Sequence, residues 1–294
     1  MRRVWTSVVL LTLCMAVGAW GHAWNNSLFF AVQFPDENVP VVDGNLADWA
    51  VVPDVPYLIG SEVLADSYYA NNEQGEIDVS DMAIRSFWGW NDNNDRLYAM
   101  AEVFDDRHVV DRSAPDEWWA DDAWEIYIDV AHLDIDEQRW EDGTKQSWNV
   151  SVPIAADNLG QMLPAHAWRT DPDTSPYWGF GWSFEGEEYG ESTYFYEIWM
   201  QPFEFIAEDG NLDNSPLAEI EADQLIHMSM AFDDDDDGGT ERTNFWTTTD
   251  GGCCKADSDM ILNELDDSID WGSQEGTAVQ SDSWGRIKSQ FITQ

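Results

Sequence analysis

Aromatic rings and carboxylates are concentrated in one stretch of the sequence, from Trp118 to Asp129. From Ala123 onward apolar and polar residues alternate, which predicts a strand with one dry face and one polar face. Trp119 stands just before this strand, and Glu125 lies on its polar face. An indole ring can stack on the apolar face of a sugar, and an ionised carboxylate accepts hydrogen bonds from adjacent hydroxyls. The stretch therefore has the chemistry of a carbohydrate contact.

Both groups also have a structural interpretation, in which Trp119 packs beneath a loop and Glu125 is a rim carboxylate paired with a lysine or arginine. The chain contains 18 tryptophans, more than a core alone usually requires, so some are expected at the surface. A sugar clamp needs a second aromatic ring, and Trp271 and Trp246 are the candidates for it.

A cation site is the second chemistry that the residues indicate. Ca²⁺ takes six to eight oxygen ligands, and the chain carries 58 acidic against 13 basic residues. Closely spaced carboxylates repel one another unless a cation lies between them. A solvated acidic loop is the alternative interpretation. The carboxylates that offer such ligands are Asp105, Asp106, Asp121, Asp122 and the run Asp233–Asp237. Those expected to hold a structural calcium ion are Asp106, Asp121, Asp122, Asp233 and Asp235.

The charge also excludes classes of partner. The formal net charge is −45, and the acids are spread along the whole chain. The phosphates of nucleic acids and of anionic membranes would be repelled, so neither is expected as a partner. Solubility in salty water explains most of the acids, because salt screens their mutual repulsion.

The sequence contains no recognisable catalytic constellation. Glycoside hydrolysis needs two carboxylates at a set separation, and the sequence selects no pair among so many acids. The histidines show neither metal-binding nor triad spacing, so a non-catalytic protein is expected. These histidines are His22, His108, His132, His166 and His227.

Residues 1–23 have the features of a secretory signal peptide. A basic start precedes an apolar run from Val8 to Val17, and cleavage is expected after Ala19 or Ala23. No later stretch reaches the roughly 18 apolar residues of a membrane span. We therefore expect secretion to the extracellular space or the periplasm, with residues 24–294 forming a single domain.

Short segments with strand periodicity alternate with turn residues along this domain. The pattern is typical of an all-β fold, an antiparallel jelly-roll-like β-sandwich with long acidic loops. The region from Asp157 to Gly190 is expected to be a long excursion, and the adjacent Cys253 and Cys254 offer no disulfide framework. The main strands are expected at about Met82–Trp90, Arg96–Phe104, Ala123–Asp129, Gln146–Pro153, Tyr194–Trp199, Leu225–Phe232 and Trp284–Phe291.

Five blocks and a closing segment, in this order, resemble the family 9 carbohydrate-binding modules and the related DOMON-like β-sandwiches. The most specific block is Trp119–Asp129, which is similar to a tryptophan followed by an acidic turn and a "V-E-I-F-I-D" strand. The full set is Val41–Trp49, Phe87–Asp106, Trp119–Asp129, Tyr196–Phe203, Met228–Asp237 and Trp284–Ile287.

The resemblance implies a secreted sandwich that grips sugars between aromatic rings and holds structural calcium. Trp119 matches an aromatic platform, Glu125 matches a carboxylate that accepts hydrogen bonds from sugar hydroxyls, and Asp122 matches a calcium ligand. The chain departs from the family pattern where an arginine is expected on the strand after Trp119–Asp129, because Trp148-Asn149 occupies that region. The implied role is polysaccharide or oligosaccharide binding, accessory to polysaccharide degradation, and the sequence indicates no oligomeric state.

Two other classes of function remain open. Some DOMON-like sandwiches hold a b-type haem through a methionine with a histidine or lysine, and residues on the expected strands offer such side chains. Methionines in strands are more often core filling, so haem is not expected. The other alternative is a cell-surface module that binds proteins. The residues with haem-ligating side chains are Met100, His227, Met228 and Met230.

Overall fold

The structure is a computed structural model that describes residues 28–68, 73–75, 77–111, 118–134, 137, 143–153, 160–162, 175–239, 241–248 and 258–272. The expected signal peptide and the expected closing strand Trp284–Phe291 lie outside these residues. No helix within the described ranges is long and apolar enough to cross a membrane.

Strands dominate the described residues, and the helical segments are short. The strands are β1 (Phe29–Gln33), β2 (Ile59–Gly60), β3 (Ala65–Tyr68), β4 (Glu73–Gly75), β5 (Met82–Asn91), β6 (Arg96–Asp105), β7 (Ala123–Asp129), β8 (Gln146–Val150), β9 (Gly160–Met162), β10 (Trp178–Gly186), β11 (Ser192–Met200), β12 (Leu225–Asp234), β13 (Asn244–Thr247) and β14 (Ser258–Leu262). The helical segments are η2 (Asp36–Asn38), η3 (Leu46–Trp49), α1 (Asp54–Tyr57), η4 (Ser61–Val63), η5 (Trp118–Ala120) and η6 (Leu212–Asn214).

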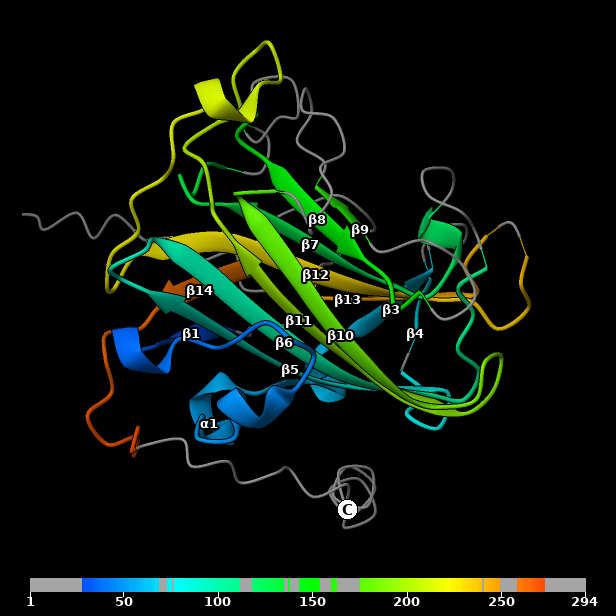
Figure 1. Cartoon of the computed structure of the whole chain (residues 1–294). Coiled ribbons are helices and arrows are strands. Elements are labelled where there is room, and N and C mark those ends of the chain that lie inside the picture. Colours follow the sequence, from blue (N-terminus) through cyan, green and yellow to red (C-terminus); the bar gives the residue numbers. More distant parts are fainter. Residues whose placement is uncertain are drawn as a thin grey trace, which may run out of the picture.

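All the strands belong to one sheet that folds over into two layers (Figure 1). The first layer has the order β10-β11-β6-β5-β1, and β1 leads through β14 to β12 in the second layer. β12 pairs with β7 along one edge and with β14 and β13 along the other, and β8 and β9 continue beyond β7. The predicted all-β sandwich is therefore confirmed.

The prediction of a purely antiparallel arrangement fails at one strand. β1 pairs in parallel with both β5 and β14, whereas the other ladders are antiparallel among the described strands. Parallel neighbours need long connections, and β14 lies at the opposite end of the described chain from β1. A second correction concerns the expected excursion Asp157–Gly190, because Trp178–Gly186 forms β10 and pairs with β11.

The main core lies between the two layers, and the predicted alternation explains it. On β7, Trp124, Ile126 and Ile128 point into this core, and Trp124 stacks on Phe232 with ring centroids 5.6 Å apart. On β6 the inward residues are Leu97, Ala99, Ala101 and Val103, as the alternating pattern predicts.

The outer face of β5 and β6 is buried as well. Tyr98 and Met100 contribute to a second hydrophobic cluster that also contains Phe34 and Trp49 from the amino-terminal segment. Glu197 on β11 fixes this segment, because it accepts hydrogen bonds from Trp49 Nε1 at 2.9 Å and from two backbone N–H groups of the turn around Gly44. The second layer is thus the one whose outer face is left for polar residues.

Candidate functional site

A polar surface lies on the outer side of β7, β8 and β12. Because Ile126, Trp148 and Met230 point into the main core, their neighbours along each strand point the other way. Strand register places Glu125 directly between Asn149 on β8 and Ala231 on β12. We define the polar face as Glu125, Tyr127, Ser147, Asn149, Ser229 and Asp233, all of which are buried.

An arginine from outside these strands binds the carboxylates of the polar face. Arg242 lies between β12 and β13, and its Nη1 donates to Glu125 Oε1 at 3.1 Å and to Asp233 Oδ1. Its guanidinium also lies over the ring of Phe245, 3.9 Å from the centroid. Burial lowers the pKa of Arg242, but the two carboxylates outweigh this effect and raise it above its ordinary value. Arg242 therefore stays charged and fixes both acids.

Glu125 is held from its other oxygen as well. The hydroxyl of Tyr127 donates to Glu125 Oε2. Burial, followed by the charge of Glu125, raises the pKa of this phenol well above its ordinary value, so Tyr127 remains a neutral donor. Glu125 is thus neither a solvated carboxylate nor a rim residue. The predicted pairing with a basic residue is present, but the partner is buried with it.

Asn149 is a residue of the polar face whose side chain is left without hydrogen bonds. It is 2% exposed, and neither its Nδ2 nor its Oδ1 has a hydrogen-bond partner among the described residues, where Asp233 Oδ2 on the same face also lacks one. A carboxamide supplies two N–H donors and an acceptor oxygen, and leaving such a group buried and unsatisfied costs about 1–3 kcal/mol. In native proteins most buried polar groups bind a protein group, an ordered water or an ion. A ligand hydroxyl, which both donates and accepts, has the chemistry to satisfy Asn149.

Trp119 stands at the entrance to β7. It belongs to η5, which contacts β12, and its side chain is 37% exposed. Trp119 therefore offers an indole surface next to the strand that carries Glu125. The other two predicted platforms differ from it. Trp246 is 1% exposed and opposes Phe232 within the main core, so it presents no ring face to a ligand.

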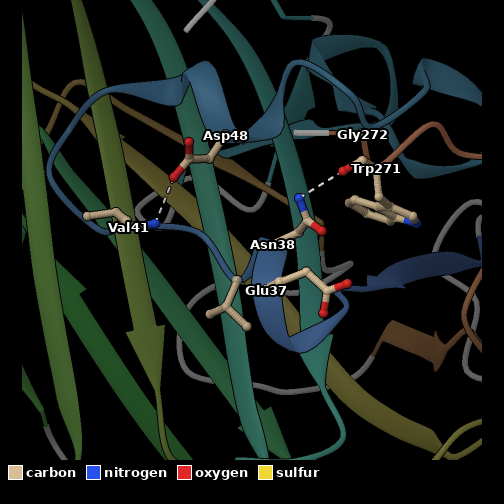
Figure 2. Close-up of a pocket in the computed structure, with 7 residues that line it drawn as sticks. Glu37, Asn38, Val41, Asp48, Trp271 and Gly272 are labelled. Carbon is tan, nitrogen blue, oxygen red and sulfur yellow. Dashed lines mark hydrogen bonds between the residues drawn. The ribbon is translucent and has the colours of Figure 1, made fainter. Parts of the chain in front are cut away.

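Trp271 lies on the other layer of the sandwich. It packs against Phe34 with ring centroids 5.5 Å apart, in the second hydrophobic cluster. Its carbonyl accepts a hydrogen bond from Asn38 Nδ2 at 3.0 Å (Figure 2). The structure therefore separates Trp271 from Trp119 and Glu125. Trp271 lines a pocket of about 600 Å³ together with Glu37, Asn38, Val39, Val41, Asp48 and Gly272.

Aspartates converge at the end of the sandwich where β6 and β12 finish and β5 begins. They form two groups, Asp81 with Asp106 and Asp236, and Asp105 with Asp234 and Asp236. In each group one carboxylate oxygen per residue lies within 4.8 Å of the others. We call these five residues the acidic end. Asp236 belongs to both groups, and its buried Oδ1 has no hydrogen-bond partner.

The acidic end is held together by few donors. Asn244 Nδ2 donates to Asp81 at 3.0 Å and to Asp234 at 2.8 Å, and the hydroxyl of Tyr194 donates to Asp105 at 3.1 Å. Burial, with the charges of neighbouring aspartates, raises the pKa of Asp81 to about 6, of Asp105 to about 7 and of Asp234 to about 8. These shifts reflect concentrated negative charge, which Arg107 offsets only in part, because it lowers the pKa of Asp236 against the larger effect of burial.

The donor set of the acidic end fits calcium. Ca²⁺ prefers carboxylate oxygens at about 2.3–2.6 Å, which allows two ligand oxygens to lie up to about 5 Å apart across the ion. The oxygens of each group meet this limit. The five carboxylates come from three strand ends, and Asp236 links the two groups.

The predicted metal ligands are only partly brought together. Asp106 belongs to the acidic end. Asp121 is buried and lies just before the start of β7 in the sequence. Asp122 accepts hydrogen bonds from the backbone N–H groups of Val109 and Asp235, so it positions loops. Asp233 belongs to the polar face instead, because successive residues of β12 point to opposite faces.

Of the acidic end, sequence reasoning missed only Asp81, because Asp105 and the run Asp233–Asp237 were already considered as calcium ligands. A signal for Asp81 was present, because the β5–β6 hairpin was predicted. Its register opposes Met82 with Asp105, so the residues just beyond them, Asp81 and Asp106, lie side by side. The backbone N–H of Asp106 indeed donates to the carbonyl of Asp81 at 2.9 Å.

The residues considered for haem ligation lie in three different places. Met100 packs in the second cluster, Met228 and Met230 point into the main core, and His227 lies on the outer side of β12. The structure brings no methionine of this set together with His227 around a common space.

No protein-family model matches the chain, and no curated protein matches it in sequence. Among solved structures, the chain is similar to a family 9 carbohydrate binding module from Caldicellulosiruptor kristjanssonii in complex with glucose, at 14% identity and a TM-score of 0.47, over 83% of this chain and 100% of that one. The same module in complex with cellotriose matches at 14% identity and a TM-score of 0.46, over 82% and 96%. A structure from Bacteroides uniformis, described as that of a carbohydrate-binding protein, matches at 11% identity and a TM-score of 0.44, over 80% and 98%. These are similarities of fold at low sequence identity.

Proposed function

We propose that this chain binds carbohydrate without catalysing a reaction, through the polar face of β7 and β8. The observation that carries the proposal is Asn149, whose buried carboxamide has no hydrogen-bond partner within the described part of the chain at either its nitrogen or its oxygen. A sugar presents many hydroxyls that donate and accept at once, so it can satisfy both atoms together. Glu125 lies opposite Asn149 and retains acceptor capacity beyond the bonds to Arg242 and Tyr127.

Trp119 supplies the stacking surface in this proposal. Its exposed indole stands at the beginning of the strand that carries Glu125. Sugars combine an apolar ring face with a polar rim, so an aromatic ring beside a carboxamide and a carboxylate matches both parts. The arginine that the family pattern placed on the following strand is replaced here by Arg242, which reaches Glu125 from the β12–β13 connection.

The polar face does not favour hydrolysis. A glycoside hydrolase needs one carboxyl group as a proton donor and a second as a nucleophile or base. Glu125 and Asp233 both bind the same nitrogen of Arg242, so neither is free for such a role.

Calcium at the acidic end is part of the same proposal. Asp81, Asp105, Asp106, Asp234 and Asp236 would hold the ion, which would offset their repulsion and fix the ends of β5, β6 and β12. Secretion through residues 1–23 and a role accessory to polysaccharide degradation complete the proposed function.

Affinity electrophoresis tests the proposal. The purified chain is run in gels containing xylan, β-glucan or cellulose derivatives, with and without a calcium chelator. We expect retardation by at least one glycan and its loss in Trp119→Ala. Phe205→Ala is the matched control, because Phe205 is 43% exposed and lies away from β7 in the sequence. A folded chain that no glycan retards would favour a protein-interaction module, and equal retardation of both variants would remove Trp119 from the site.

A further inference from the structure

Two histidines and an aspartate meet at the end of β12 opposite the acidic end. Strand register places His227 between Asp129 on β7 and Asp259 on β14, and all three point away from the main core. The turn that follows β7 carries His132 back over the same spot. The site lies roughly 20 Å along β12 from Asp234, so it is separate from the acidic end.

The nitrogen atoms of both imidazoles converge on one carboxylate oxygen. His132 Nε2 lies 3.0 Å from Asp259 Oδ1, and His227 Nε2 lies 3.5 Å from the same atom. The two rings lie with centroids 3.8 Å apart and planes tilted by 31°. Zn–N and Zn–O bonds of about 2.0–2.1 Å at tetrahedral angles separate neighbouring donor atoms by about 3.3 Å. The two observed spacings are close to that value, and all three donor atoms lie within 4.8 Å of one another, as three ligands around one small ion require.

The chemistry of this donor set differs from that of the acidic end. Two imidazoles and one carboxylate suit zinc and other divalent first-row transition metals, whereas calcium needs six to eight oxygens. Histidine ligands commonly place their second ring nitrogen toward a carboxylate, which fixes the ring. Here His227 Nδ1 faces Asp129 Oδ2 at 3.8 Å.

The turn after β7 is built to keep His132 and Asp129 in place. The carboxylate of Asp129 accepts from the backbone N–H of Ala131 at 3.0 Å and of Leu133 at 2.8 Å. His132 has a φ of 51°, in the left-handed region that residues other than glycine seldom adopt. Such backbone strain is typically retained at functional positions.

The cluster is open to solvent on one side. The side chain of His132 is 27% exposed, whereas those of His227 and Asp259 are 0% and 4% exposed. An ion can therefore enter past His132 and reach two ligands that are already fixed in the sheet. Three protein ligands leave the fourth tetrahedral position for water or for a group on another molecule.

We propose that His132, His227 and Asp259 form a binding site for zinc or a similar divalent transition metal, with Asp129 orienting His227. This site is independent of carbohydrate binding and of calcium.

Zinc binding tests the site directly. The chain is prepared without a polyhistidine tag, with Cys253→Ser and Cys254→Ser because adjacent thiols would themselves bind zinc. ZnCl₂ is then titrated by calorimetry in the presence of excess CaCl₂, which occupies the carboxylates elsewhere. We expect one Zn²⁺ per chain, and Co²⁺ in its place should give the intense visible absorption of a four-coordinate complex.

Variants separate a metal site from a merely structural cluster. His132→Ala and Asp259→Asn should each abolish the Co²⁺ spectrum. Each should also weaken Zn²⁺ binding by more than about 100-fold, because losing a ligand costs more than losing a residue that only orients one, for which about 100-fold is the upper range. Asp267→Asn, at an exposed carboxylate, should change neither measurement. If Asp259→Asn does not fold, His132→Ala decides, because its side chain is partly exposed on a turn.

Two results would overturn the proposal. One is the absence of a saturable zinc site in the folded chain. The other is that His132→Ala still binds zinc as the wild type does, and that the variant lowers the melting temperature by the same amount with and without zinc. Either outcome would make the cluster a packed arrangement of imidazoles bridged by Asp259.

Discussion

Arg242 and Glu125 are 117 residues apart in the sequence, yet Arg242 Nη1 lies 3.1 Å from Glu125 Oε1. The same nitrogen binds Asp233, which precedes the turn that carries Arg242. One guanidinium thereby joins β7 to the end of β12 on the outer side of these strands.

Removing this guanidinium should strongly destabilise the chain. Arg242→Met leaves Glu125 and Asp233 buried without a counter-charge, and breaking a buried pair in this way costs about 3–5 kcal/mol. The free energy of unfolding from urea titration measures the effect. Arg85→Met is the control, because the Arg85–Asp54 pair is more exposed, and surface pairs contribute about 0–1 kcal/mol. Equal losses in the two variants would contradict the structural role of Arg242.

Asn149 should behave in the opposite way. Since its carboxamide makes no hydrogen bond, Asn149→Leu should leave the free energy of unfolding unchanged or raise it by up to about 1–3 kcal/mol. Asn91 is the control, because it is equally buried but donates to Phe34 O at 2.9 Å and accepts from Asn94 N at 3.1 Å. Asn91→Leu should therefore destabilise. A comparable loss in both variants would mean that Asn149 is structurally bonded.

The acidic end predicts a pH dependence that calcium reverses. The folded-state pKa is raised to about 6 for Asp81, about 7 for Asp105 and about 8 for Asp234, against about 3.9 in an unfolded chain. The folded chain without metal binds more protons, so the stabilisation is complete below about pH 4 and is lost as the pH rises to about 8. Ionised carboxylates bind calcium, so added calcium should raise the melting temperature increasingly over the same range.

Melting temperatures between pH 4 and pH 8, in chelator and in excess calcium, measure this effect. Asp234→Asn should weaken both the pH dependence and the calcium effect, whereas Asp267→Asn, at an exposed position, should not. Profiles that fall in parallel with and without calcium would exclude a cation at the acidic end.

Gly44 should tolerate no side chain. Its φ is 80°, and a Cβ atom there would lie 2.2 Å from the backbone carbon of Trp182. Because both the conformation and the contact are unfavourable, Gly44→Ala should lower the free energy of unfolding by at least about 1–3 kcal/mol. At Gly190 the nearest heavy atom would lie 3.3 Å away, so Gly190→Ala is the milder control. A neutral Gly44→Ala would show that this turn does not dock on β10.

Local periodicity was enough to predict the layers of the fold. The alternation of Ala123–Asp129 placed Trp124 in the core and Glu125 on the other face, and both placements hold. The burial of Tyr98 and Met100 was not predictable in this way, because it depends on an amino-terminal segment that covers β5 and β6 from outside. The parallel pairing of β1 likewise joins distant segments that carry no local signal.

The residues of the candidate site divide in the same way, into those that the local sequence predicts and those whose positions depend on strand pairing. Trp119 and Glu125 were found because they lie six residues apart in one sequence motif, in η5 and on the β7 strand that follows it. Arg242 was missed because its position depends on the pairing of β7 with β12 and on the turn that follows. The meeting of His132 with His227 depends on that same pairing, so the spacing of histidines in the sequence gave no sign of it.

Calorimetry with the glycan that retards the chain tests whether Asn149 contributes to binding. It gives the dissociation constants of the wild type and of Asn149→Leu. Asn214→Ala, at an exposed asparagine, is the control. We expect the wild type and Asn214→Ala to bind the glycan. A stably folded Asn149→Leu should have a dissociation constant at least about tenfold higher, because it lacks one buried hydrogen-bonding group. An unchanged dissociation constant in Asn149→Leu, or a folded wild type that binds no glycan, would contradict the proposed function.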